Sequence, residues 1–203
     1  QHGVALIGQR GLESLKSAAS DEVRKERDSV ATVGQLHPDV VGVDLGGTKI
    51  SAVLADSEGR ILRRDYRATE AEKGPEAVIG RIAAAVRQVA GSETVAGIGI
   101  AAAGLCTRDG VITTSPNLPG WKDVPLSSII QGEFRLPTYL GNDANVAALG
   151  EHRYGAGRGA RDLVYVTLGT GIGGGIIANG QLVTGASGTA GAAAVLTMAA
   201  EGE

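Results

Sequence analysis

Cysteine and aromatic residues are scarce in this sequence. Cys106 is the single cysteine among 203 residues, and aromatic side chains make up 3% of the chain. One cysteine can form neither an internal disulfide nor a cysteine-rich zinc site, so the sequence predicts neither. With so few aromatic rings the core has to be built from Val, Ile, Leu and Ala, and a hydrophobic content of 43% is sufficient for one.

An excess of positive charge and a long apolar segment are also lacking. The formal net charge is -3, whereas nucleic-acid-binding proteins normally carry a basic surface, so no nucleic-acid partner is predicted. The sequence has no apolar region of the signal-peptide type and no apolar run long enough to cross a membrane. We therefore expect a cytoplasmic protein that does not associate with membranes.

Glycine, by contrast, is abundant, with 32 residues, and is densest in residues 164–183. An apolar run enters a turn predicted to hold Gly169, Gly171, Gly173, Gly174 and Gly175, a second apolar run (176–178) leaves it, and a turn at Asn179 and Gly180 precedes a short strand. Closely spaced glycines let backbone N–H groups converge on phosphate oxygens. The alternative is a glycine-rich hairpin that binds no ligand.

Residues 41–62 repeat this pattern of apolar strand, glycine turn, apolar strand, second turn and third strand. When the two copies are aligned, V-D-L-G of residues 43–46 corresponds to V-T-L-G of residues 166–169. Two copies of a phosphate-type hairpin in one chain indicate an internal duplication. We therefore expect two similar lobes that face a shared cleft.

The remaining segments predict an α/β protein preceded by a charged leader. Residues 1–39 contain a charged block at 21–28 and no apolar face that could dock, so they are interpreted as a leader or flexible appendage. After them the pattern predicts strands at 40–45, 49–55, 60–68, 95–104 and 137–140, and helices at 75–90, 126–131 and 143–154. A strand, a helix and a buried strand in succession are typical of an α/β crossover.

Several polar residues occupy positions that suit a binding site. Asp143 follows a predicted strand and opens a helix, which favours either a catalytic carboxylate at the carboxyl end of a sheet or a helix N-cap. Its neighbours Asn142 and Asn145 could hydrogen-bond to hydroxyl groups. Asp44 stands just before a glycine pair, as a turn-forming residue or as a ligand of phosphate-bound magnesium. Trp121 predicts an ordered loop at residues 115–121.

Five motifs, in this order, resemble those of the ROK family of sugar kinases and repressors, most closely its glucokinase branch. They are V-D-L-G-G-T-K (43–49), S-P-N-L-P-G-W (115–121), G-N-D-A-N-V-A-A-L-G-E (141–151), L-G-T-G-I-G-G-G (168–175) and G-A-S-G-T-A-G (185–191). The resemblance implies an α/β, actin-like (ribonuclease-H-like) sugar-kinase fold with ATP and sugar in the cleft. Residues 40–155 would form the first lobe, and residues 156–203 would begin the second, nucleotide-side lobe.

The same resemblance assigns roles to individual residues. Asp143 is implied as the general base on the sugar's 6-hydroxyl, with Asn117 and Asn142 binding other hydroxyls; Asp44, Gly46, Gly47, Thr48 and Lys49 as the first phosphate loop; and Gly169, Thr170 and Gly171 as the second. Asp44 would also meet Mg²⁺ through phosphates or water. Phosphoryl transfer depends on positioning and charge stabilisation, which these residue types can supply.

The chain departs from the family after residue 191. The family continues with E-x-G-H, whose Glu and His hold the sugar, where this sequence has A-A-A-V at 192–195. The family's later cysteine-rich zinc segment has no counterpart either, so no zinc is expected. The second lobe is therefore predicted to be incomplete, and the sequence leaves three explanations open: a fragment, a frame-shifted or altered tail, or a natural short form.

Two functions from different classes follow from the resemblance. The first is an ATP- and Mg²⁺-dependent hexose kinase of the glucokinase type that acts on glucose, with a homodimer as the expected assembly. The second is a ROK-like sugar-binding regulatory protein, or an inactive fragment, without turnover. A scaffold or dimerisation remnant is a third alternative. The sequence does not distinguish among hexoses or between ATP and polyphosphate as donor.

Overall fold

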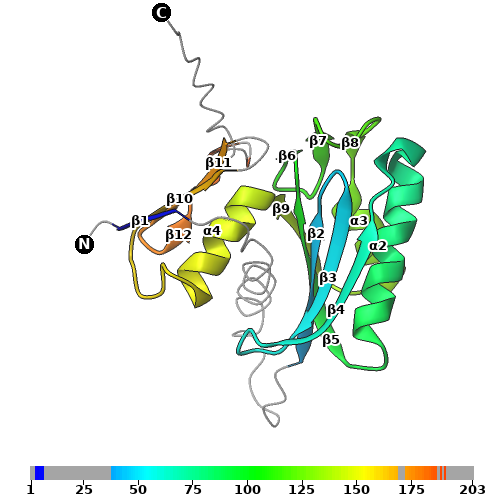
Figure 1. Cartoon of the computed structure of the whole chain (residues 1–203), viewed down its shortest axis with the longest axis horizontal. Helices are drawn as coiled ribbons and strands as arrows, with labels where there is room; N and C mark the ends of the chain where they lie inside the picture. Colours follow the sequence, from blue (N-terminus) through cyan, green and yellow to red (C-terminus); the bar gives the residue numbers. More distant parts are fainter. Residues whose placement is uncertain (1–2, 7–37, 169–171, 187, 189, 191–203) are drawn as a thin grey trace, which may run out of the picture.

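Two β-sheets lie on either side of one helix, α4, in the computed structural model (Figure 1). The structure describes residues 3–6, 38–168, 172–186, 188 and 190. Its elements are β1 (Gly3–Leu6), β2 (Asp39–Leu45), β3 (Lys49–Ala55), β4 (Ile61–Ala68), the 3-10 helix η1 (Ala71–Lys73), α2 (Gly74–Ala90), β5 (Val95–Ala102), β6 (Leu105–Cys106), β7 (Ile112–Thr114), β8 (Lys122–Val124), α3 (Leu126–Phe134), β9 (Thr138–Asn142), α4 (Asp143–Tyr154), β10 (Leu163–Leu168), β11 (Ile172–Ala178) and β12 (Gln181–Leu182). None of the described helices is long and apolar enough to cross a membrane.

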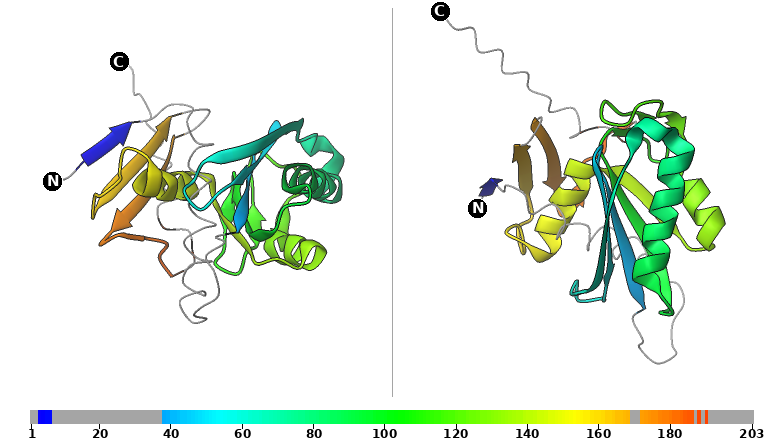
Figure 2. Two further views of the ribbon diagram at one scale, coloured as in Figure 1. Left: turned by 90° about the horizontal axis from the view of Figure 1, so that it is seen from below. Right: turned by 45° about the vertical axis from the view of Figure 1, so that its right-hand side comes forward.

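The first sheet has the strand order β4-β3-β2-β5-β9. Its first three strands form an antiparallel meander, and β5 and β9 then add in parallel. Helices α2 and α3 pack on one face of this sheet and close the main hydrophobic core, which consists largely of Val, Ile, Leu and Ala as the scarcity of aromatics predicts (Figure 2). The α/β class and the crossover from β4 through α2 to β5 are confirmed.

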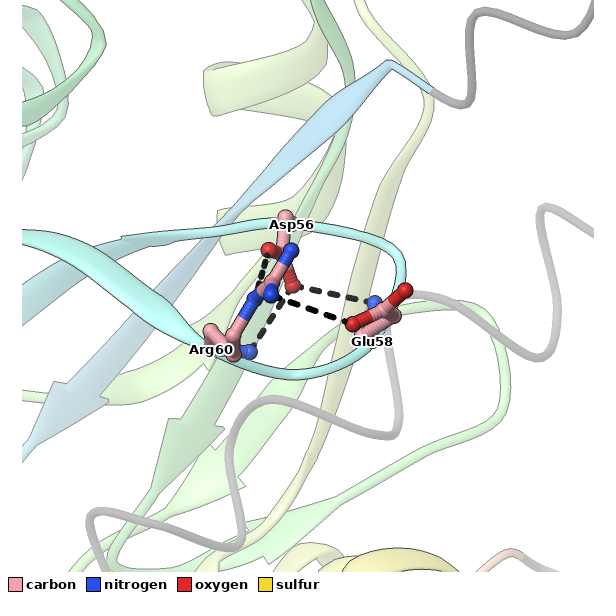
Figure 3. Close-up of polar contacts among 3 residues, drawn as sticks. All are labelled: Asp56, Glu58 and Arg60. Atoms are coloured by element: carbon pink, nitrogen blue, oxygen red, sulfur yellow. Dashed lines mark hydrogen bonds and ion pairs between the residues drawn. The ribbon is translucent and has the colours of Figure 1, made fainter.

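The second turn of the first meander is held by one carboxylate. Asp56 Oδ1 accepts hydrogen bonds from the backbone N–H of Glu58 (3.0 Å) and of Arg60 (2.9 Å), and its Oδ2 accepts one from Arg60 Nε at 2.7 Å (Figure 3). Partial burial favours the protonated acid, but the bonds from Arg60 and Glu58 outweigh it and lower the pKa of Asp56. A side chain that bonds its own backbone two residues on is the reason Asp favours such turns.

The second sheet, in the order β1-β10-β11-β12, corrects the predicted glycine turn. Strand β11 begins at Ile172, so Gly173, Gly174 and Gly175 lie within the strand and pair with Thr167, Val166 and Tyr165 of β10. The predicted turn at Asn179 and Gly180 is confirmed. The prediction that these three glycines lie in the turn is therefore wrong, because they pair with β10, and at Gly173 and Gly175 the lack of a side chain makes room for α4.

Two of these glycines allow helix α4 to approach the sheet closely. A Cβ atom on Gly175 would lie 2.5 Å from Ala148 Cβ, and one on Gly173 would lie 3.2 Å from Ala144 Cβ. Real Cβ atoms do not come as close as the first distance, so a side chain at Gly175 would push α4 away. The small residues of α4 and the glycines of β11 thus form one closely packed contact.

The loop at residues 115–121 is ordered, as predicted. Trp121 is 3% exposed and Leu118 is 1% exposed, and both belong to the main core. The small sheet β6-β7-β8 around this loop is a feature that the sequence did not predict. Of the predicted leader, Gly3–Leu6 forms β1, which pairs in parallel with β10, while residues 7–37 lie outside the described residues.

Substituting Gly175 by Ala should destabilise the protein by about 1–3 kcal/mol, because the new methyl group overpacks the contact with Ala148. Gly80→Ala is the matched control, since a Cβ on Gly80 in α2 meets nothing within 4 Å, and alanine in a helix interior is neutral or stabilising by up to about 1 kcal/mol. Urea unfolding of both variants measures the difference. Equal stability of the two variants would contradict the proposed close contact.

Candidate active site

The carboxyl ends of three parallel strands bring the predicted acidic residues to one edge of the first sheet. Asp44 of β2 lies opposite Ala101 of β5, and Ala101 lies opposite Gly141 of β9. Neighbouring strands are about 4.8 Å apart, so the backbone of Asp44 is about 10 Å from that of Gly141. Asp143 follows two residues after Gly141. It therefore lies just beyond the carboxyl ends of the strands, where open α/β sheets normally bind ligands.

Asp143 is the first residue of α4 and stays accessible to solvent. Its Oδ1 accepts hydrogen bonds from the backbone N–H of Ala144 at 2.9 Å and from Asn142 Nδ2 at 3.0 Å. The surrounding protein nevertheless raises the pKa of Asp143, because desolvation outweighs these two bonds. Asp143 is therefore accessible to solvent and at the same time partly desolvated by the protein around it.

The helix cap is Asn142, which resolves the choice left open for Asp143. Asn142 Oδ1 accepts from the N–H groups of Ala144 (3.1 Å) and Asn145 (3.3 Å), and its Nδ2 donates to Gly104 O (3.1 Å) as well as to Asp143. The alternative that Asp143 is the N-cap is therefore wrong. Because both donors and both acceptor sites of the Asn142 amide are engaged, its binding of a sugar hydroxyl stays a prediction.

Asp44 and Asp143 influence each other electrostatically. Burial, and second to it the charge of Asp143, raises the pKa of Asp44 to about 6, although Lys49 acts in the opposite direction. Burial and the same charge raise the pKa of the Cys106 thiol to about 12, so this cysteine is not a thiolate nucleophile at neutral pH. Two carboxylates whose charges repel each other provide a local preference for a cation.

The first glycine loop is a tight turn held by a residue that the sequence analysis missed. Gly46 N–H donates to Lys49 O at 3.0 Å and closes the turn. Thr69, which is fully buried, donates through Oγ1 to Gly46 O (2.7 Å) and through its N–H to Thr48 O (3.0 Å). Thr69 therefore fixes both sides of the loop. Its role is visible only in the structure, because Thr69 follows β4 and is more than 20 residues from the loop in the sequence.

The same loop touches the proline-rich loop at residues 115–121. A Cβ atom on Gly47 would lie 2.7 Å from Asn117 O and 2.9 Å from Asn117 Cβ. Glycine is needed at this position because the two loops approach each other so closely. Asn117 is itself exposed, and the contact places it beside the loop that contains Thr48. Two motifs separated by about 70 residues in the sequence thus adjoin.

Other predicted residues are placed less completely. Lys49 is exposed, and its Nζ lies 5.2 Å from the centroid of the Tyr66 ring, a cation–π arrangement. Gly169, Thr170 and Gly171, the predicted second phosphate loop, lie outside the described residues. In the part of the chain that the structure describes, no group of three or more His, Cys, Asp or Glu residues could hold a metal ion by itself.

A cavity of about 1080 Å³ extends from Asn142 to the segment that follows β12. Asn145, which is 3% exposed, lines it, and Asn145 Oδ1 has no hydrogen-bond partner among the described residues. Across the cavity Arg108 Nη2 donates to Thr184 Oγ1 (3.1 Å) and to Gly185 O (2.5 Å). These bonds attach the start of the motif at residues 185–191 to the first lobe.

The fold and these motifs identify the family. The sequence model of the ROK family matches residues 40–203, and the chain belongs to this family. The actin-like sugar-kinase fold is confirmed by solved ROK structures. The ROK family glucokinase from Streptomyces griseus, in complex with glucose and AMPPNP, has a TM-score of 0.71 and 41% identity, over 76% of this chain and 49% of that one.

Among curated relatives, the chain is similar to a glucokinase and to a repressor. It is 43% identical over 150 residues to the glucokinase of Thermotoga maritima, covering 73% of this chain and 47% of that protein. It is 37% identical over 155 residues to the xylose repressor of Bacillus subtilis, covering 74% of this chain and 40% of that protein. The chain therefore spans about half the length of the relatives that it matches.

The raised pKa of Asp44 predicts that this residue lowers stability as pH rises. The folded state holds the proton more tightly than the unfolded state, so the stability contributed by Asp44 is present near pH 4 and is lost as pH rises through about 6. The free energy of unfolding of Asp44→Asn, relative to the unchanged protein, should therefore increase between about pH 4 and about pH 7, by on the order of 3 kcal/mol. Urea titrations at several pH values measure it; parallel pH profiles would contradict it.

Replacing Thr69 by Val should loosen the first glycine loop, because the isosteric side chain cannot donate to Gly46 O. We expect a loss of about 0.5–1.5 kcal/mol in stability and faster hydrogen exchange at residues 46–49. Thr69→Ser keeps the hydroxyl and is the control, in which exchange should stay near that of the unchanged protein. Unchanged exchange in Thr69→Val would show that the bond does not hold the loop.

Proposed function

We propose that this protein acts in the ATP-dependent phosphorylation of a hexose, with glucose as the substrate and its 6-hydroxyl as the acceptor. The observation that carries the proposal is the position of Asp143, a solvent-accessible carboxylate beside Asp44 and the first glycine loop at one edge of the sheet. Membership in a family that contains glucokinases supports the same activity.

Asp143 is suited to the role of general base. Its Oδ1 already accepts two hydrogen bonds, and these fix the direction of the carboxylate at the start of α4. The other carboxylate oxygen of Asp143 can accept the proton of a sugar hydroxyl while the hydroxyl oxygen attacks the terminal phosphoryl group of ATP. Desolvation raises the pKa of Asp143 toward the working pH, which favours proton transfer in a general base.

The neighbouring residues would orient the two substrates. Asn117 lies exposed beside the first loop and can bind a sugar hydroxyl next to the phosphates. Gly46 and Gly47 present backbone without side chains, and Thr48 and Lys49 are accessible for phosphate oxygens. Lys49 would leave the ring of Tyr66 to reach a phosphate. Gly169, Thr170 and Gly171 would complete the nucleotide side of the site.

Magnesium would enter with the nucleotide. Mg²⁺ in such sites is usually bound by one or two carboxylates together with substrate phosphates and water, and Asp44 next to the glycine loop fits that donor set. Burial and the nearby charge of Asp143 disfavour the ionised form of Asp44, and a cation bound there would stabilise that form. Bound there, Mg²⁺ would neutralise charge on the phosphates, while Asp44 holds and orients it.

A sugar-binding regulatory role is the second candidate, because xylose repressors match the chain over a similar length. The A-A-A-V sequence at residues 192–195, in place of the family's E-x-G-H, also favours a regulator or an inactive fragment over a kinase. Since the chain spans about half of its relatives, turnover, the homodimer and a cytoplasmic location all belong to the proposal.

The test is a coupled assay of the purified protein with glucose and Mg-ATP. Asp143→Asn should lower kcat by at least about 100-fold, because the amide cannot accept the proton, whereas glucose binding measured by thermal shift should persist. Glu58→Gln, which alters an exposed carboxylate in the second turn of the first meander, should leave kcat unchanged. Sugar binding without turnover in the unchanged protein would favour the regulator instead.

A further inference from the structure

Ser51 lies at the centre of a row of three side chains that crosses the first sheet beside the first glycine loop. In the strand register, Ser51 of β3 is directly opposite Asp44 of β2 on one side and Tyr66 of β4 on the other. Residues that pair directly across antiparallel strands lie on the same face of the sheet. Their strand neighbours Val43 and Ala52 belong to the core that α2 closes. Asp44 and Ser51 therefore share the opposite face.

The hydroxyl of Ser51 is buried and unpaired. Ser51 is 0% exposed, and its Oγ has no hydrogen-bond partner among the described residues. A buried hydroxyl without a partner lowers stability, because it has given up its hydrogen bonds to water. Ser127 shows the usual arrangement in the same protein, since its buried Oγ donates to Thr138 O. Packing of the sheet alone therefore does not account for a serine at position 51.

Asp44 provides the acceptor that the Ser51 hydroxyl can reach. The Cβ atoms of directly opposite residues are about 4.5–5.5 Å apart, so rotation of the two side chains brings hydroxyl and carboxylate within hydrogen-bond distance. No described residue donates a hydrogen bond to the Asp44 carboxylate, although the protein around it partly buries it. The residues that flank Ser51 on this face of β3 offer no acceptor, since Lys49 only donates and Val53 is apolar. The hydroxyl of Tyr66 lies at the far end of its ring, and Tyr66 is 52% exposed.

We propose that Ser51 is a positioning residue for the magnesium ligand: its hydroxyl donates a hydrogen bond to one carboxylate oxygen of Asp44 and leaves the other oxygen free to meet Mg²⁺. Side chains that bind a metal are usually held by such a second hydrogen bond, which fixes their orientation. The structure shows the two groups as neighbours, and the bond forms when a bound cation fixes the direction of Asp44. The inference rests on the proposed function, in which Asp44 binds Mg²⁺ together with the nucleotide.

The test measures binding of the ATP analogue AMPPNP by isothermal titration calorimetry, with Mg²⁺ and with EDTA, so that no turnover is needed. Ser51→Ala should weaken binding of Mg-AMPPNP by about 10–100-fold, the usual effect of removing the hydrogen bond that holds a metal-binding side chain. Binding of AMPPNP in EDTA should stay the same. Ser51→Cys should behave like Ser51→Ala, because a thiol fills the space of the hydroxyl but is a weak donor.

Ser127→Ala is the matched control, because it removes a buried serine hydroxyl that joins α3 to β9. It should lower the midpoint of urea unfolding, since a made hydrogen bond is lost, and leave binding of Mg-AMPPNP unchanged. Ser51→Ala should do the reverse. Its unfolding midpoint should stay the same or rise, because an unpaired buried hydroxyl is removed, while Mg²⁺-dependent binding is lost. A purely structural role for Ser51 would instead lower the midpoint and weaken binding equally with and without Mg²⁺.

The role of Ser51 is overturned if Ser51→Ala binds Mg-AMPPNP as tightly as the unchanged protein, if the loss is equal in EDTA, or if the unchanged protein shows no Mg²⁺-dependent binding. The kinase proposal fails on a separate observation, the absence of turnover with glucose and Mg-ATP. Selective loss of Mg²⁺-dependent binding in a protein without turnover would support the role of Ser51 and reject the kinase. Turnover that Ser51→Ala leaves unchanged at limiting Mg²⁺ would do the opposite.

Discussion

The close contact between α4 and the second sheet is the constraint on which the rest of the structure depends. It requires glycine at position 175 of β11, where a Cβ atom would lie 2.5 Å from Ala148 Cβ, and a side chain at position 173 would crowd Ala144 of α4. The same helix begins at the carboxyl end of β9, so the contact that joins the two lobes also sets the direction of the residues at its N-terminus. Asn142 caps the helix and at the same time holds Asp143.

Charge at the edge of the first sheet follows from this arrangement. Asp44 comes from the first meander and Asp143 from the start of α4, and their mutual repulsion adds to burial in raising the pKa of Asp44. Such a pair is unfavourable for stability by itself, which is typical of sites whose ligands bring compensating charge. Thr69 and the approach of Gly47 to Asn117 keep the neighbouring loops in place around this pair.

The two lobes share the plan of a duplicated unit and differ in the helix that covers the sheet of the first lobe. Each has an antiparallel meander with the same register and a parallel strand at the same edge. In the first lobe the chain continues from β4 into α2, which returns over the sheet and buries its apolar face. In the second lobe the corresponding side chains of Val164, Leu168 and Ile176 are exposed.

The sequence by itself determined the elements whose signal is local. Strand β3 and helix α2 follow from apolar periodicity and turn residues, and Asp143 could be placed at a junction of strand and helix. Tertiary structure alone decided that Asn142 caps α4, that Thr69 holds the glycine loop, and that Gly173 and Gly175 serve helix packing. These features depend on contacts between segments far apart in the chain, and a local pattern of residues contains no information about which distant segment will approach it.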